Sequence, residues 1–168
     1  MLSSAGPAEA HAVRTVLVER LGIAPEVLAD LRLLCTSNVV WAIRKSDALE
    51  EALDIFRAER TGLPLIRRVG KHWKPTTAAL QAFGEHLTRG IVTLTAVELE
   101  RLLIQGSLRG TRAELDEGYV AIRGPEGIIG CGLYLNPIPE EGKVEGLLRS
   151  QLPKAQWEPF GRHLREQT

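Results

Sequence analysis

Apolar residues in the first third of the chain follow a helical pattern and then a strand pattern. Near the N-terminus they recur every three or four positions, which predicts a helix over residues 8–21. Two β-rich stretches follow, at 31–36 and 39–43. Ser37 and Asn38 separate these stretches and favour a tight turn, so the two are predicted to form a hairpin.

A helix, a strand and another helix are predicted before residue 90. Apolar residues on one face predict a helix over 46–56, and β-forming residues predict a strand over 62–69. A turn rich in basic residues is expected at 70–74. A helix is expected to open at 75–76, where proline and threonine favour a helix start. Gly90 then interrupts the pattern and is the expected domain boundary.

The second half of the chain is predicted to be richer in strands. A short strand at 91–94 leads into Thr95 and Glu98, whose spacing is that of a capping box, and the helix it starts should end at Gly106. The remaining predictions are a strand at 118–123, its hairpin partner at 128–135, a loop at 136–142 and a bent strand pair at 143–152.

This order of elements predicts an α+β protein with two domains, at 1–89 and 90–168. Of the 168 residues, 44% are hydrophobic and 25% are charged, which excludes collagen-like, mucin-like and wholly disordered chains. The N-terminus lacks the regions of a signal peptide, and no apolar run approaches the ~20 residues that span a bilayer. We therefore expect a cytoplasmic protein with no membrane partner.

The charge of the chain is balanced overall and uneven locally. It has 21 basic and 21 acidic residues, which excludes a general polycation. Residues 47–59, however, contain five acidic residues and one arginine, whereas residues 60–84 contain five basic residues and no acidic one. Trp73 lies between Lys71 and Lys74, an arrangement that suits nucleic acid. An ordinary solvated face whose Trp73 caps the core fits the same pattern.

Signatures of enzymes and metal sites are missing from the sequence. It has no P-loop and no strand-anchored GxGxxG, and Gly130-Cys131-Gly132 is interpreted as part of a closely packed strand. The four histidines form no HxH or HxxxH pair, so no zinc site is expected. Cys35 and Cys131 are interpreted as small buried apolar residues. We expect neither a cofactor nor catalysis.

Three stretches of the second half resemble a known family. They are GYVAIR at 118–123, IIGCGLY at 128–134 and GLLRSQLPK at 146–154. Together they resemble the core of a PUA domain, the RNA-binding fold of pseudouridine synthases and archaeosine transglycosylases. They are most similar to the C-terminal PUA-like domain of RsmF-type and Sun-family RNA cytosine-5 methyltransferases.

The first half resembles the pre-PUA domain of the Nip-family ribosome-biogenesis proteins, through residues 22–41 and 62–87. The two resemblances together imply an N-terminal α/β pre-PUA domain followed by a C-terminal PUA-like β-barrel. The chain lacks the strand–glycine loop that binds S-adenosylmethionine, and it lacks the Pro-Cys dipeptide of the methyltransferases; Cys35 does not match it. The resemblance therefore implies the RNA-binding appendage without the catalyst.

In the PUA family, RNA lies against the face made by the helix, the glycine loop after it and the last strand. Arg149 stands where the methyltransferases have Lys, which keeps the charge, and Ser150 stands where they have Asn. Carried over by position, the face comprises Arg101, Gly106, Ser107, Arg109, Arg149 and Lys154. The first domain would extend it with Arg67, Arg68, Lys71 and Lys74.

Three hypotheses follow. The first is a noncatalytic RNA-binding protein that docks on structured rRNA or tRNA in RNA modification or ribosome biogenesis. The second is a protein–protein adaptor for an RNA methyltransferase or a pre-ribosomal particle. The third is a small-ligand binder or small enzyme of a PUA-related barrel. If the first hypothesis holds, we expect the structure to show one basic face that joins Arg101, Arg109 and Arg149.

Overall fold

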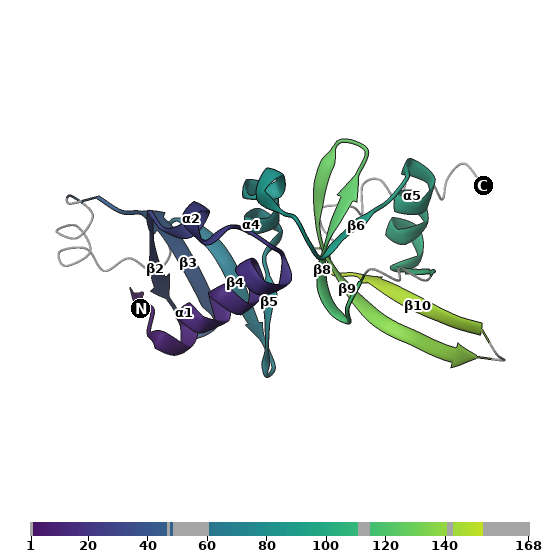
Figure 1. Cartoon of the computed structure of the whole chain (residues 1–168), viewed down its shortest axis with the longest axis horizontal. Coiled ribbons are helices and arrows are strands. Elements are labelled where there is room, and N and C mark those ends of the chain that lie inside the picture. The colour runs from purple at the N-terminus through teal and green to yellow at the C-terminus, as the bar shows by residue number, and fades with distance from the viewer. Residues whose placement is uncertain (1, 47, 49–60, 111–114, 141–142, 153–168) are drawn as a thin grey trace. The chain divides into compact units, whose positions relative to one another are not determined.

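The protein is a mixed α+β molecule with two mostly antiparallel sheets (Figure 1). The computed structural model describes residues 2–46, 48, 61–110, 115–140 and 143–152, with the backbone alone at 137–140 and 143–145. The chain forms two compact units that divide between Arg89 and Gly90. Their assignment as a pre-PUA and a PUA-like domain remains a prediction.

The N-terminal unit is built on a five-stranded antiparallel sheet in the order β1-β2-β3-β4-β5. Its elements are β1 (Ser3–Ser4), α1 (Pro7–Val13), η1 (Arg14–Arg20), α2 (Pro25–Leu28), β2 (Leu31–Cys35), β3 (Val39–Arg44), β4 (Leu63–Val69), β5 (His72–Pro75), α4 (Thr77–Ala82) and η2 (Gly84–His86). Figure 1 shows α1 lying across one face of this sheet.

Most of the predictions for this unit are confirmed. The expected N-terminal helix is present as α1, which continues directly into η1, a π-helix. The hairpin predicted around Ser37 and Asn38 is the antiparallel pair β2–β3. Leu17 and Leu21 are fully buried, as the helical pattern requires. The helix expected at 46–56 lies almost entirely outside the described residues.

The predicted basic turn at 70–74 is wrong in its extent. Only Gly70 and Lys71 form the turn, and the chain then returns along β4 as the strand β5. Pro75 ends this strand and does not open the next helix. Thr76 is the N-cap residue, and its hydroxyl accepts a hydrogen bond from the Ala79 amide at 3.0 Å.

The C-terminal unit contains the second sheet, in the order β6-β8-β9-β10-β7. Its elements are β6 (Ile91–Thr93), α5 (Ala96–Gln105), β7 (Ser107–Arg109), β8 (Gly118–Gly124), β9 (Gly127–Glu140) and β10 (Lys143–Ser150). The pair β6–β8 is parallel and the other pairs are antiparallel. In the described residues β6 and β7 are the two outer strands, so the sheet is open and no closed barrel is found.

The start and end of α5 agree with the sequence prediction. The Thr95 hydroxyl accepts a hydrogen bond from the Glu98 amide at 3.2 Å, and the Thr95 amide donates to Glu98 Oε2 at 2.8 Å. This is the predicted capping box. Gly106 ends the helix in the left-handed conformation, with φ at 74°.

Two predictions for the last third of the chain are wrong. The stretch expected to be a loop is mostly strand, because β9 continues through Pro137 and Pro139 to Glu140. Beyond Tyr134 the β9 strand has no partner in β8, and such an edge position tolerates proline. The expected strand pair at 143–152 is one strand, β10, which pairs with β9 in a ribbon that extends beyond the other strands (Figure 1).

The core of the C-terminal unit lies between α5 and one face of the sheet. Its buried residues are Val92, Leu94, Leu102, Val120, Ile122, Tyr134 and Leu148. Gly132 borders this core, and a Cβ at that position would lie 2.8 Å from Leu148 Cδ1. The interpretation of Gly130-Cys131-Gly132 as a closely packed strand is therefore confirmed.

Candidate RNA-binding surface

The helix, the glycine and the last strand named by the resemblance meet in the C-terminal unit. The chain leaves α5 at Gly106 and enters β7, which pairs with β10. The Ser150 amide donates a hydrogen bond to the Gly106 carbonyl at 2.8 Å, and the Gly110 amide donates to the Gly146 carbonyl at 3.0 Å. These two bonds hold β7 against β10 at both of its ends.

This pairing places Arg109 and Arg149 on the same face of the sheet. Ser107 lies opposite Arg149, and Arg109 lies opposite Leu147. Since residues two apart on a strand share a face, Arg109 and Arg149 are diagonal neighbours on adjacent strands. Both arginines are exposed.

The alternate residues of the same strands show which face this is. Leu108 lies opposite Leu148, which is 3% exposed, and both pack in the core. Arg109 and Arg149 therefore point away from the core, on the face of the sheet that α5 does not cover.

Tyr119 belongs to the same face and was missed by the sequence prediction. It lies opposite Leu133, which lies opposite Arg149 in the next strand. Val120 and Ile122 are fully buried in the core, and their alternation with Tyr119 is the signal that could have identified it. We define the outer sheet surface as Ser107, Arg109, Tyr119, Leu133, Leu147 and Arg149.

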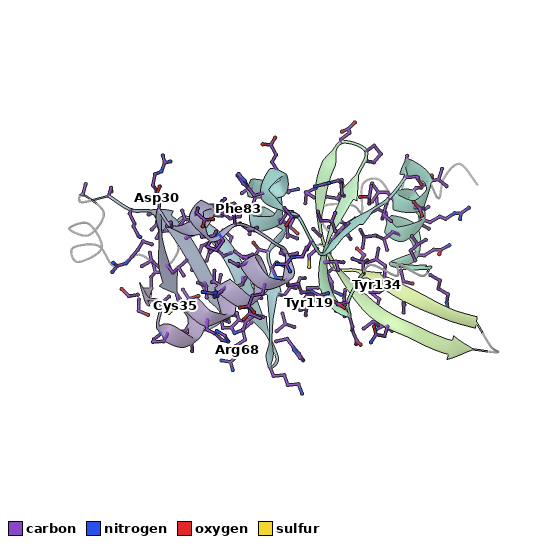
Figure 2. All side chains as sticks on the ribbon, in the orientation of Figure 1. Asp30, Cys35, Arg68, Phe83, Tyr119 and Tyr134 are labelled. Atoms are coloured by element: carbon purple, nitrogen blue, oxygen red, sulfur yellow. The ribbon has the colours of Figure 1, made fainter. Side chains whose placement is uncertain are left out.

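The outer sheet surface is partly apolar. Tyr119, Leu133 and Leu147 are half-buried. Partial burial raises the pKa of the Tyr119 phenol, and nearby Cys131 raises it further. Farther along this face Ala121 and Cys131 are fully buried, so the exposed cations lie toward the β7 edge of the sheet. Tyr134 lies opposite Gly118, the residue before Tyr119, so the two tyrosines labelled in Figure 2 leave the sheet on opposite faces.

Arg101 is not brought together with the two strand arginines. On α5, Val97 is 58% exposed and Ile104 is 43% exposed, and Arg101 is exposed between them at helical spacing. Leu102 faces the core from the other side of the helix. The expected single basic face therefore does not form, because α5 and the sheet separate Arg101 from Arg149. Lys154 lies outside the described residues.

The basic residues of the N-terminal unit lie on the β4–β5 hairpin, on both of its faces. Arg67 pairs across the strands with Lys74, and Arg68 pairs with Trp73. Neighbouring residues of a strand point to opposite faces, so the two pairs are on opposite sides of the hairpin. Lys71 is exposed in the turn.

Neither a metal site nor a membrane span is found in the part of the chain that the structure describes. No group of three or more His, Cys, Asp or Glu residues could hold a metal ion there. No described helix is long and apolar enough to cross a bilayer. Of the two free cysteines, Cys131 is buried as expected and Cys35 is only half-buried.

The outer sheet surface thus offers two exposed arginine side chains, a phenol and apolar side chains in adjacent rows. Guanidinium groups bind phosphate oxygens, and a tyrosine ring offers a face on which a base or a sugar can pack. Comparisons of the chain with protein-family models and with curated proteins find no match.

Proposed function

We propose that the protein is a noncatalytic RNA-binding protein that docks on structured rRNA or tRNA in RNA modification or ribosome biogenesis. The observation that carries this proposal is the diagonal placement of Arg109 and Arg149 on an exposed sheet face. Gly106 and Ser107 lie beside them. In this proposal the two arginines bind phosphates, and Tyr119 and Leu133 pack on the exposed parts of a nucleotide.

We further propose that the C-terminal unit is a PUA-like domain and the N-terminal unit a pre-PUA domain. The sequence resemblance supports this assignment. The order of elements also supports it, because a strand, β6, leads through the helix α5 and Gly106 to a strand that pairs with the last strand.

Binding should be modest and sensitive to salt, because few cations are available. The net charge of the chain is zero, so long-range attraction to RNA is weak and local contacts must supply the affinity. Each phosphate neutralised by a cation releases counterions, which makes the affinity fall as salt rises.

Filter binding of the full chain to rRNA fragments and tRNA, repeated over a salt series, tests the proposal. We expect measurable affinity at low salt and a logarithmic salt slope of about −1.5 or steeper, since two arginines contribute roughly that much. The absence of affinity at low salt, or an affinity that does not change with salt, would contradict the proposal.

The exposed face of α5 favours a second candidate function, that of an adaptor for an RNA methyltransferase or a pre-ribosomal particle. Val97 and Ile104 are among the few large hydrophobic side chains that the described residues expose. An adaptor would retain its partner after nuclease treatment. It would lose that partner on Val97→Asp with Ile104→Asp, while Arg109→Ala with Arg149→Ala would leave it bound.

A further inference from the structure

The β4–β5 hairpin is an unusual element of the N-terminal unit because its charge is of one sign and lies on both faces. Between residues 60 and 84 the chain has no acidic residue. Arg67 is exposed on one face, Arg68 is exposed on the other, and Lys71 is exposed at the turn. Within the described residues, no ion pair involves Arg67 or Lys71.

The position of the hairpin leaves these cations accessible. β5 is the last strand of its sheet, so the hairpin has a neighbouring strand on the β4 side alone. At the turn, no atom from beyond the two chain neighbours of Gly70 lies within 4 Å of the position that a Cβ would occupy. A flat RNA surface could meet the cations of one face. Cations on two faces and at the tip suit a site with phosphate backbone on both sides.

Arg68 and Trp73 add a second kind of contact. The guanidinium carbon of Arg68 lies 5.9 Å from the centre of the Trp73 ring, within the range of a cation–π interaction. Trp73 is half-buried, and Arg68, which is labelled in Figure 2, is exposed. In addition, the Arg68 amide donates a hydrogen bond to the Asn38 carbonyl at 2.8 Å, which fixes the backbone at this position. The Trp73 ring thus lies within cation–π range of the Arg68 guanidinium group.

A guanidinium plane can stack on a base, and only an unpaired base presents its face to a side chain. We infer that the β4–β5 hairpin is a second RNA-contacting element, which inserts at a bulge or internal loop and stacks Arg68 on an unpaired base. In this inference Arg67 and Lys71 bind the flanking phosphates, and Trp73 positions Arg68. The inference rests on the proposed function, and it adds that the RNA contains an unpaired nucleotide within a paired region.

Two fluorescently labelled RNA duplexes provide the test, one fully paired and one with a single bulged adenosine in the same sequence. The full chain should bind the bulged duplex about fivefold or more tightly, from one stacked base. Arg68→Lys keeps the charge but removes the plane, so it should abolish this preference while changing affinity for the paired duplex less than about twofold. Arg44→Lys, at the exposed end of β3, is the matched control and should change neither affinity.

The variant Arg67→Ala with Lys71→Ala should weaken binding to the bulged duplex more than binding to the paired duplex, because the hairpin inserts only where a nucleotide is unpaired. Equal binding of the two duplexes by the unmodified chain would overturn this inference and leave the proposed function standing. An undiminished preference in Arg68→Lys would overturn it too. Failure to bind either duplex would count against the proposed function as well.

Discussion

Gly146 is a residue next to the candidate site whose missing side chain matters for packing. A Cβ there would lie 2.2 Å from the Tyr134 hydroxyl oxygen, and Tyr134 is 1% exposed. The register of β9 and β10 also shifts between Glu145 and Leu147. Between these two pairs β9 advances three residues, from Leu135 to Ile138, while β10 advances two, so the extra residue belongs to β9 and Gly146 lies in the β10 segment opposite it.

Gly146→Ala should therefore destabilise the protein. Forcing a methyl group against the Tyr134 ring requires the core to move, and we expect the free energy of unfolding to fall by about 2 kcal/mol. Urea denaturation would measure this. In a Tyr134→Phe background, which lacks the hydroxyl oxygen, Gly146→Ala should lower the free energy of unfolding by a smaller amount. Unchanged stability in Gly146→Ala would contradict the close contact.

The raised pKa of Tyr119 predicts a dependence of stability on alkaline pH. The unfolded chain loses this proton near pH ~10, whereas the folded chain retains it to a higher pH. The folded state then binds more protons, so the free energy of unfolding falls as the pH rises above about 10. Between pH 9 and pH 11, denaturation should show a smaller fall in the free energy of unfolding for Tyr119→Phe than for the unmodified chain. An equal fall in both proteins would contradict a raised pKa of Tyr119 in the folded state.

Individual site residues were predictable to different degrees. The resemblance named Gly106, Ser107, Arg109 and Arg149, and the structure brings these four together. The resemblance could not show that Arg101 lies apart from these four residues, because the place of Arg101 depends on which side of α5 packs on the sheet. Tyr119 was missed because its place beside Arg149 depends on strand register, which is not a local property of the sequence.

At the scale of elements, the capping box of α5 gives a direct prediction. Thr95→Ala removes the hydroxyl that accepts from the Glu98 amide, and it should lower stability by about 1 kcal/mol. Thermal unfolding would detect this as a fall in Tm. Thr93→Ala, a nearby exposed threonine outside the cap, is the control and should have little effect. Equal effects of the two changes would mean that the cap does not stabilise the helix.

Elements with local signals were predicted well, and those defined by their partners were not. The Thr95 cap and the Ser37–Asn38 turn are local, and both are present as predicted. The sequence predicts a turn where β5 lies, because four residues have too little pattern to identify a strand without β4 beside them. The length of β9 was missed because its prolines favour a loop except at the edge of a sheet.

At the scale of the whole molecule, the balanced charge conceals separate basic regions. The described structure places one pair of cations on the outer sheet surface and another group on the β4–β5 hairpin. Each region holds few charges, so we expect RNA binding that depends on shape and on particular nucleotides more than on total charge. The order of the strands within each sheet could not be predicted, since it depends on contacts distant in the sequence.

The most direct test of the RNA-binding surface compares two variants that lose the same charge. Arg109→Ala with Arg149→Ala removes both cations of the outer sheet surface, whereas Arg14→Ala with Arg44→Ala removes two exposed arginines elsewhere. In filter binding to structured RNA over a salt series, the first variant should bind about tenfold more weakly, with a logarithmic salt slope shallower by about 1.5. The second variant should bind like the unmodified chain. Equal losses in the two variants, or no loss in the first, would contradict the assignment of this surface.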